Sequence, residues 1–340
     1  MHILRPYLKQ LFLVSLVFSL IACGQFLPQP SPPTAEVQTS EQLSESSKSA
    51  CRSIQHALGE TCVPAQPQRI ATLSDVDLVS VIALGLQPIA TVFYTSPNDV
   101  PAYLQGKVNG VQVLGTHDQP NIERMLKFKP DLIIGLSYSV EPIYSLLSRI
   151  APTIAGEWQG TSSWRDHFNF VAKVLDKPAE VQQVWDHYDQ RIQALKVALK
   201  MDATHPDHLP LKISVFHICC GSLHVDTKNS FNGSILADVG FQRPASQDMV
   251  AEGGLRFISE EFIPEIDADV LFIPTDNQDQ DSNQKLAELK QSPLWQQLKV
   301  VQRGRVYAVD YHIWRGANVY AADGVIDDLF KYLVDDAQPA

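Results

Sequence analysis

The chain has 340 residues, of which 45% are hydrophobic, and its formal net charge at pH 7 is −11. An acidic balance of this size argues against a nucleic-acid-binding protein, which needs a basic surface, and against electrostatic binding to anionic lipid. The length is sufficient for two modest lobes, each with its own core.

The first 22 residues have the pattern of an export signal. A short basic start precedes an apolar run from Leu11 to Ala22, which is shorter than the roughly 20 residues of a membrane-spanning helix. The run ends in Leu20-Ile21-Ala22-Cys23, which resembles a bacterial lipoprotein lipobox. We therefore expect cleavage after residue 22 and acylation of Cys23. The alternative is a plain signal peptide with an incidental cysteine.

Cleavage at this point leaves 25 basic against 38 acidic side chains, a formal charge of −13 with histidine neutral. The acyl chains, rather than surface charge, would then anchor the mature protein. Residues 24 to about 50 are rich in Pro, Ser, Gln and Glu and lack apolar periodicity, which is typical of a flexible tether. We assign residues 23–67 to this lipidated tether and an N-terminal arm.

The four remaining cysteines fall into two pairs. Cys51 and Cys62 are eleven positions apart in a loop-like segment of the arm, and an exported protein meets an oxidising compartment. We expect them to form a disulfide that fixes the arm. Cys219 and Cys220 are adjacent, and two interpretations stay open for them, small core side chains or a strained vicinal disulfide.

From residue 68 to 176 the pattern alternates between strands and helices. Strands are predicted at 69–74, 88–93, 111–114, 131–135 and 152–155, and helices at 75–84, 121–129, 142–150 and 164–175. Asn121 has the character of a helix N-cap, and Pro130 stops that helix. Such alternation is typical of βαβ units and a mostly parallel sheet, so we expect an N-terminal α/β lobe.

A long helix is predicted next. From Pro178 to Lys200 the apolar side chains recur at spacings of three and four on one stripe, with no Gly or Pro after the first turn. Asp176 and Pro178 are start signals. With strand-and-helix sequence on both sides, residues 177–203 are interpreted as a bridge between two lobes. The alternative is an ordinary covering helix of a single α/β domain.

Residues 204–340 show the same alternation of predicted strands and helices. Strands are predicted at 211–217, 269–273 and 305–309, and helices at 230–239, 283–291 and 317–333. Residues 223–225 are a candidate strand partner for the first of these strands. A short helix, EEFIPEI, follows Ser259. The fold class is therefore α/β, with two lobes of mostly parallel sheet joined by one long α-helix.

Five segments, in this order and behind a lipobox, carry a resemblance to a known family. They read CRSIQHALGETCVPAQPQRIATL, GTHDQPNIERMLKFKPDLIIG, KNSFNGSILADVGFQRP, ISEEFIPEIDADVLFI and SPLWQQLKVVQRGRVYAVDYHIW. The chain from Cys51 to Leu333 resembles the periplasmic iron-siderophore binding proteins of ABC importers. The resemblance implies a ligand cleft between the two lobes and only a small closure on binding.

The cleft residues are predicted from position, because open α/β sheets bind ligands at the carboxyl ends of their strands. His117 matches a position that carries a basic ligand contact in hydroxamate-binding relatives, and Trp314 matches an aromatic one. Aromatic faces would cover the apolar body of a chelate, while Arg and Tyr donate to its oxygens. The predicted ligand-binding residues are Tyr94, His117, Tyr138, Trp158, His217, Arg256, Tyr311, Trp314 and Arg315.

The function that the resemblance implies is capture of a ferric siderophore, of hydroxamate or citrate type, and its delivery to a membrane permease and its ATPase. No cofactor is expected, and the iron would be held by the chelate, with no direct metal site. By position, Glu123 and Glu261 match the acidic residues that pair with permease arginines. The expected location is the periplasm, with a lipid anchor in the inner membrane or on the outer face of the cell membrane, as a monomer.

Other function classes were weighed. A zinc or manganese binding protein would need three or four converging ligands, and His117, His167, His217 and His312 are the candidates. A haem or cobalamin carrier also suits an aromatic cleft. No G-x-S-x-G, G-x-x-x-x-G-K-[ST] or G-x-G-x-x-G motif supports an enzyme. A surface adhesin or sensor would suit the tether, but does not require the Trp, Tyr and Arg positions.

The lipobox generates a first prediction. A Cys23→Ser substitution removes the thiol that would be acylated, so we expect the protein to leave the membrane fraction and its processing to change. Fractionation and immunoblotting measure both changes. Unchanged processing and membrane association in the variant would contradict lipidation at this residue.

Overall fold

The structure is a computed structural model that describes residues 51–93, 100–201, 210–219 and 221–335. Five features expected from the sequence lie outside these residues, namely the export signal at 1–22, Cys23, the tether at 24–50, Tyr94 and Cys220. Within the described ranges, no helix combines the length and apolarity needed to cross a membrane.

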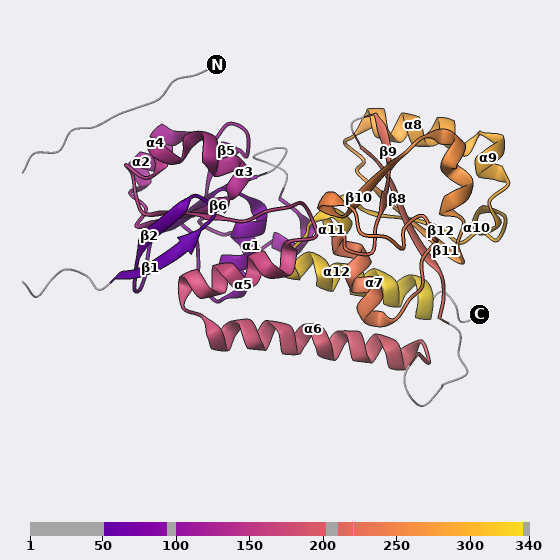
Figure 1. Cartoon of the computed structure of the whole chain (residues 1–340), viewed down its shortest axis with the longest axis horizontal. Coiled ribbons are helices and arrows are strands. Elements are labelled where there is room, and N and C mark those ends of the chain that lie inside the picture. Colours follow the sequence, from indigo (N-terminus) through magenta and orange to yellow (C-terminus); the bar gives the residue numbers. More distant parts are fainter. Residues whose placement is uncertain (1–50, 94–99, 202–209, 220, 336–340) are drawn as a thin grey trace, which may run out of the picture. The chain divides into compact units, whose positions relative to one another are not determined.

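The N-lobe, residues 70–175, is built on a five-stranded parallel sheet (Figure 1). Its strand order is β5-β4-β3-β6-β7, and all neighbouring pairs are parallel. Except for the edge strand β5, the strands are fully buried and rich in Ile, Val, Leu and Ala, as expected for a sheet covered by helices on both faces. They are β3 (Ile70–Thr72), β4 (Ala90–Phe93), β5 (Gln112–Thr116), β6 (Leu132–Leu136) and β7 (Thr153–Gly156).

Side-chain caps define the starts of two N-lobe helices. Ser74 accepts a hydrogen bond from the Asp77 amide at the start of α1, and Asn121 accepts one from the Arg124 amide at the start of α2. The helix predicted at 142–150 is shorter and divided, because Pro142 cannot donate a backbone hydrogen bond. The helical segments are α1 (Asp75–Ala83), η1 (Ala102–Leu104), α2 (Ile122–Phe128), α3 (Ser137–Val140), η2 (Glu141–Ile143), α4 (Tyr144–Leu147) and α5 (Trp164–Leu175).

The N-terminal arm is an antiparallel hairpin, not the loop-like segment that the sequence suggested. Strands β1 (Cys51–His56) and β2 (Gly59–Pro64) pair along their whole length, and a Cys51–Cys62 disulfide joins them with Cα atoms 5.5 Å apart. Ile54 and Val63 are buried in the N-lobe core. The hairpin is therefore part of the folded lobe, and it was missed because its alternation is short and polar.

Helix α6 (Pro178–Ala198) connects the lobes, as expected, and runs alongside both of them (Figure 1). Its 21 residues span about 30 Å. Its buried stripe includes Tyr188, Ile192 and Leu195, and it packs against α5, α7 and α12. The role predicted for Asp176 is wrong, because this residue adopts a left-handed conformation that ends α5, and only Pro178 marks the start of α6.

The C-lobe, from residue 213 onward, contains a mixed five-stranded sheet of order β10-β9-β8-β11-β12. Its strands β8, β11 and β12 are parallel, whereas β9 pairs with β8 in the antiparallel sense that the sequence suggested. Strand β10, which was not predicted, adds an antiparallel edge. The strands are β8 (Ile213–Cys219), β9 (Ser222–Asp226), β10 (Leu255–Ile258), β11 (Val270–Thr275) and β12 (Val306–Asp310).

Two C-lobe helices differ from the sequence-based expectation. The segment after Ser259 is a 3₁₀ helix rather than an α-helix, consistent with Pro264 inside it. A short helix, α11 (Tyr311–Arg315), follows β12 directly, with Asp310 as its N-cap. The other helical segments are α7 (Phe231–Val239), η3 (Glu252–Gly254), η4 (Glu260–Ile266), α8 (Gln280–Lys290), α9 (Pro293–Gln296), α10 (Lys299–Gln302), α12 (Val319–Phe330) and η5 (Lys331–Asp335).

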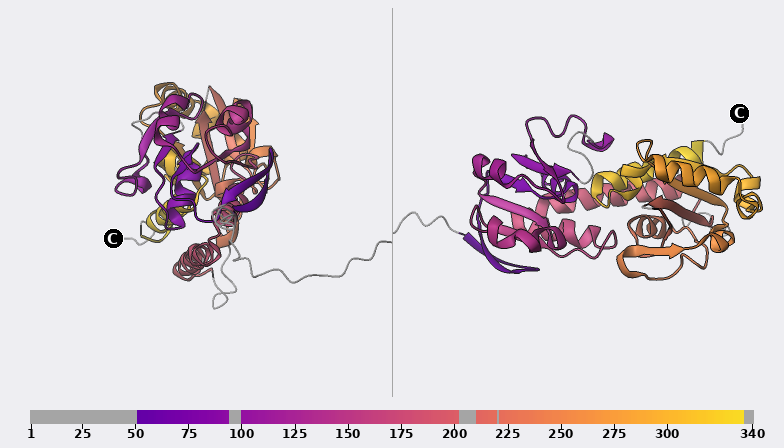
Figure 2. Two further views of the ribbon diagram at one scale, coloured as in Figure 1. Left: turned by 90° about the vertical axis from the view of Figure 1, so that its left-hand side faces the viewer. Right: turned by 90° about the horizontal axis from the view of Figure 1, so that it is seen from above.

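An aromatic junction holds the two lobes together. Trp164 of α5 makes edge contacts with Trp185 and Tyr188 of α6 and with Phe231 of α7, at ring distances of 5.2 to 6.1 Å. The Trp164 indole also donates to the Ser234 hydroxyl at 3.1 Å. Both lobes belong to one compact unit, and α12 extends from the C-lobe to pack against α1 of the N-lobe (Figure 2).

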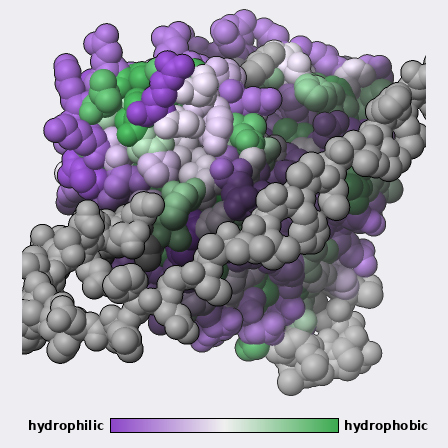
Figure 3. All heavy atoms as spheres, turned by 60° about the vertical axis from the view of Figure 1, so that its left-hand side comes forward, coloured by the Kyte–Doolittle hydropathy of each residue, from purple (hydrophilic) through white to green (hydrophobic). Residues whose placement is uncertain are grey.

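The surface has few large apolar side chains. Hydrophilic residues predominate on the face shown in Figure 3, and hydrophobic ones form small separate groups. Among the described residues, the most exposed large apolar side chain is Phe257 on the edge strand β10, at 69%. This distribution is usual for a folded protein, in which isolated apolar side chains need no partner.

Candidate ligand-binding site

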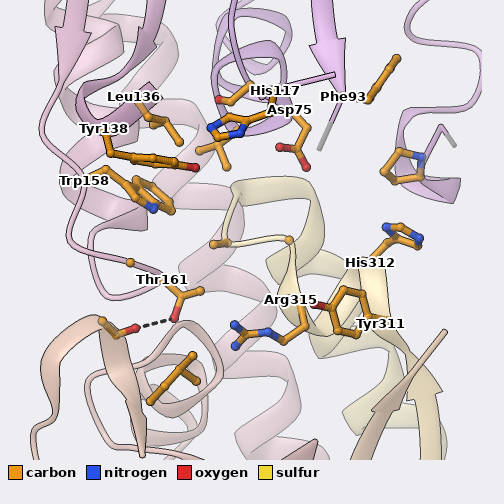
Figure 4. A pocket seen from close by; sticks show the side chains of 18 residues that line it. Asp75, Phe93, His117, Leu136, Tyr138, Trp158, Thr161, Tyr311, His312 and Arg315 are labelled. Atoms are coloured by element: carbon orange, nitrogen blue, oxygen red, sulfur yellow. Dashed lines mark hydrogen bonds between the residues drawn. The ribbon is translucent and has the colours of Figure 1, made fainter. Parts of the chain in front are cut away.

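A cavity of about 300 Å³ lies between the lobes and is lined by residues from both (Figure 4). Its N-lobe lining comes from segments that follow the carboxyl ends of β3, β5, β6 and β7. Its C-lobe lining comes from η3, the start of β10, and α11 with the residues after it. The cavity is therefore at the place that the topology of an open parallel sheet predicts.

Aromatic rings and an imidazole form much of the N-lobe wall. His117 follows β5, and its ring lies 5.0 Å from that of Tyr138, which follows β6. The His117 Nδ1 is 2.9 Å from the Asp118 carboxylate. Trp158, after β7, contacts the buried His167 ring edge to face at 5.6 Å. These rings offer flat apolar faces to a ligand, with polar edges between them.

Trp158 is supported from behind by a buried polar chain. The His167 Nε2 lies 2.8 Å from Asp77 Oδ1, and both side chains are fully buried. Ser74, which lines the cavity, donates to the other oxygen of Asp77 at 2.5 Å. Because the two partners of Asp77 satisfy both carboxylate oxygens, His167 is fixed in place and so is the indole that rests on it.

Helix α11 supplies the C-lobe wall, with Tyr311, His312 and Arg315 lining the cavity. The Arg315 side chain is only 14% exposed, and its Nη1 lies 3.5 Å from Asp226 Oδ1. Within the described structure its Nε and Nη1 have no hydrogen-bond partner. Figure 4 shows the guanidinium at the side of the cavity opposite His117 and Asp75.

Asp226 is part of a buried network that anchors α11. Asn232 of α7 donates at 2.7 Å both to Asp226 Oδ2 and to the carbonyl of Trp314. Burial raises the pKa of the Asp226 carboxyl, while the Arg315 charge and the hydrogen bonds from Asn232 and Ser230 oppose that rise. The network thus links β9 and α7 to the helix that carries Arg315.

Asp75 is a cavity residue that the sequence analysis treated only as the start of a helix. It is the first residue of α1 and lines the cavity on the N-lobe side. Burial raises the pKa of its carboxyl, and the neighbouring Asp77 adds to this, whereas its own amide, the Val76 amide and His312 lower it. The rule that selected residues after strand ends would have found it, since it follows β3.

The lobes also touch at the edge of the cavity. Thr161 donates to the Gly253 carbonyl at 3.2 Å, as drawn in Figure 4. Gly160 has a φ of +77°, and a Cβ placed there would lie 2.5 Å from the Gly253 Cα. Glycine is therefore required at position 160 for this approach of the two backbones.

Five of the predicted ligand-binding residues line this cavity, namely His117, Tyr138, Trp158, Tyr311 and Arg315. Three others do not, and their predicted position in the cleft is corrected here. Trp314 is fully buried, stacks near Phe272 at 4.5 Å and donates to Asp328 at 2.7 Å. Since successive residues of a helix point in different directions, α11 turns Arg315 to the cavity and Trp314 to the core.

The other two corrections follow from strand geometry. Arg256 is next to the cavity residue Leu255 on β10, so it faces the opposite side, where it donates to Glu265 at 3.1 Å. His217 is buried inside β8 and stacks on His224 at 5.0 Å. Burial is the main reason that the pKa of His217 is well below its usual value, with Arg315 and His224 acting in the same direction.

The four histidines considered for a metal site do not converge. His117 and His312 line the cavity, whereas His167 pairs with Asp77 and His217 lies in the C-lobe sheet. In the part of the chain that the structure describes, no three His, Cys, Asp or Glu side chains are grouped to hold a metal ion.

The two predicted docking residues are both on the surface. Glu123 is exposed in the first turn of α2, and Glu261 is exposed in the first turn of η4. A hydrogen bond from Ser259 is the main cause of a lowered pKa for Glu261, together with its own backbone amide. Neither residue lines the cavity.

Comparison with known proteins identifies the family. Residues 70–311 match the family described as periplasmic binding protein. The chain belongs to this family. It is 33% identical over 300 residues to the probable siderophore-binding lipoprotein YfiY of Bacillus subtilis (strain 168), covering 86% of this chain and 90% of that protein. The family resemblance seen in the sequence is thereby confirmed, and the protein is a binding protein, not an enzyme.

Two further comparisons support this assignment. The chain is 26% identical over 266 residues to the achromobactin-binding periplasmic protein of Dickeya dadantii (strain 3937), covering 78% of this chain and 86% of that one. The structure of Staphylococcus aureus SirA complexed with staphyloferrin B is similar with a TM-score of 0.71 and 27% identity, covering 83% of this chain and 98% of that one. The chain therefore shares with this solved structure its fold of two lobes joined by one long helix, here α6.

The buried His217 generates a prediction about stability. In the unfolded chain this imidazole gains a proton as the pH falls through its usual pKa of 6.5, while in the folded protein it stays neutral. The unfolded state then binds more protons, so the free energy of unfolding falls as the pH falls below this value.

We therefore expect His217→Gln to flatten the pH dependence of unfolding by up to about 1.4 kcal/mol per pH unit below pH 6.5. Urea unfolding of both proteins at pH 7.5 and pH 5.5 measures the difference, and His187→Gln, a change at an exposed histidine of α6, is the control. Parallel pH dependences in wild type and His217→Gln would show that His217 is not the group responsible.

Proposed function

We propose that this protein captures a ferric siderophore in the interlobe cavity and delivers it to the permease of an ABC importer. Arg315 carries the proposal. Its guanidinium lines the cavity, its Nη1 lies 3.5 Å from Asp226 Oδ1, and its Nε and Nη1 have no hydrogen-bond partner among the described residues. The group therefore keeps donor capacity for a ligand that brings acceptor oxygens. Such oxygens are what the outer surface of a ferric chelate presents, and a guanidinium binds them through charge-assisted hydrogen bonds.

The rest of the cavity suits the body of such a ligand. Tyr138, Trp158 and Tyr311 offer aromatic faces, and the imidazoles of His117 and His312 add polar edges. Relatives that span most of this chain are named for siderophore binding, for achromobactin and for ferric citrate. These names support a ferric chelate as the ligand class.

The charge of the lining favours a hydroxamate or citrate type of chelate. Among the described lining residues, Arg315 is the only Lys or Arg and Asp75 the only Asp or Glu. A ferric triscatecholate carries several uncompensated negative charges, which one guanidinium would not balance inside a partly enclosed cavity. A ferric trishydroxamate has no net charge at the metal, whereas a ferric citrate complex keeps negative carboxylates that the Arg315 guanidinium can pair with.

The remaining assignments follow from the same proposal. The mature protein would be anchored through Cys23 at the periplasmic face of the membrane, as a monomer, with the iron held by the chelate. Its partners would be the permease and the ATPase that drives it. The docking surface would include Glu123 and Glu261, one on each lobe.

Arg315→Ala tests the binding site. Loss of charge-assisted hydrogen bonds to the chelate should weaken affinity roughly ten- to a hundredfold. Quenching of tryptophan fluorescence on titration with ferrioxamine B, ferric citrate and a ferric triscatecholate measures it. Arg303→Ala is the matched control, because Arg303 lies outside the cavity and is exposed beside Asp269.

The outcomes of this titration discriminate the function classes. Quenching by a hydroxamate or citrate chelate, with loss in Arg315→Ala only, supports the proposal. Tighter binding of the triscatecholate than of the other two chelates would overturn the assignment to a hydroxamate or citrate chelate. A saturable response to Zn²⁺ without any response to chelates would favour a metal-ion binding protein instead.

Glu123→Ala combined with Glu261→Ala tests delivery to the permease. Charged pairs at an interface act mainly through orientation and association rate, so the double variant should keep its chelate affinity and lose uptake of ⁵⁵Fe-labelled chelate by cells. Asp186→Ala with Asp189→Ala, two exposed acidic residues of α6, removes the same charge elsewhere. Normal uptake in the first double variant would place the docking surface elsewhere, and an equal loss of affinity would mean that these residues serve the fold.

A further inference from the structure

The two charged residues of the described cavity lining come from different lobes. Arg315 belongs to the C-lobe helix α11, and Asp75 to the start of the N-lobe helix α1. Figure 4 shows the Asp75 carboxylate directed into the space between His117 and the α11 residues. A ligand that fills this space meets a cation on one side and a carboxyl on the other.

Helix stabilisation explains only part of the position of Asp75. An acidic side chain in the first turn of a helix is stabilised by the helix dipole, and Asp75 accepts hydrogen bonds from its own amide and that of Val76. Asp77 is a second acidic residue in the same turn. No Lys, Arg or His of the described residues forms an ion pair with Asp75 within 4.0 Å. His312 acts on this carboxyl only as a nearby charge, which lowers its pKa.

The hydrogen-bonding capacity of a carboxylate determines which ligand groups can lie next to it. An ionised carboxylate only accepts hydrogen bonds, with about four lone-pair positions on its two oxygens, and two of these are used by backbone amides. The outward oxygens of a chelate would repel it, and covering it with an apolar group would leave a buried charge unpaired. A cationic N–H donor is the group that matches it, because its positive charge also offsets the burial that raises the pKa of Asp75.

We infer that the ferric chelate bound here carries a protonated amine arm that pairs with Asp75 while its oxygen-rich face meets Arg315. This inference rests on the proposed function and names the ligand class more narrowly. Asp75 is then a specificity-determining residue, because it distinguishes chelates with the same iron coordination by a group remote from the metal.

A matched pair of chelates tests this directly. Ferrioxamine B is a linear trishydroxamate that ends in a free ammonium group, and N-acetylation removes that charge without altering the iron centre. We expect wild-type protein to bind ferrioxamine B at least about tenfold more tightly than the acetylated form. Asp75→Asn keeps the size of the side chain and removes its charge, so it should bring the ratio of the two affinities close to one.

Asp189→Asn, at an exposed position on α6, is the control for loss of one negative charge, and thermal unfolding verifies that each variant is folded. Equal affinities of the wild-type protein for ferrioxamine B and for its acetylated form overturn the inference. So does an equal loss of affinity for both chelates in Asp75→Asn, which would assign Asp75 to the fold of the cavity.

The same titrations separate this inference from the proposed function. If neither trishydroxamate binds but ferric citrate, which lacks an amine, does bind, then the amine arm is excluded while ferric-chelate capture stands. If no ferric chelate binds, the proposed function fails and the inference fails with it.

Discussion

The edge contacts of Trp164 with Trp185, Tyr188 and Phe231 are the constraint on which the rest of the structure depends. They join α5, α6 and α7, which belong to the N-lobe, the connecting helix and the C-lobe. Arg165 and Asp238 complete the junction through hydrogen bonds to the Tyr188 hydroxyl at 3.0 and 2.7 Å. Aromatic side chains bury large areas and have few rotatable bonds, so this junction limits how far the lobes can rotate about α6.

The position of the cavity follows from that restriction. With the lobes held at one side by α6, the carboxyl ends of the N-lobe strands face α11 and η3 of the C-lobe, and the contact between Thr161 and Gly253 closes one edge. Such a junction is consistent with the small closure of the two lobes on ligand binding that the family resemblance implies. A ligand then gains affinity mainly from preformed contacts, because little ordering remains to be done on binding.

Buried polar groups hold two of the cavity side chains in position. Arg315 depends on Asp226 and, through the Trp314 carbonyl, on Asn232, while Trp158 depends on His167 and Asp77. Arg315 and Trp158 are therefore each held, directly or through His167, by a carboxylate that does not line the cavity. With a single cation and a single carboxyl among the described lining residues, both the total charge of a chelate and its distribution would distinguish one chelate from another.

The sequence by itself determined the two-lobe α/β fold, the connecting helix from Pro178, the Cys51–Cys62 pairing and the strand ends beside which the cavity lies. Those features are local: apolar periodicity, caps and turn residues act within a few positions of the chain. It did not determine which neighbour of a strand end faces the cavity. Arg315 and Trp314 are adjacent, as are Leu255 and Arg256, and the short helix α11 and the edge strand β10, which only the tertiary structure revealed, direct one of each pair inward. The partnership of Asp226 with Arg315 joins residues 89 positions apart in the sequence, and such a contact is decided by packing between elements, not by the pattern within any one of them.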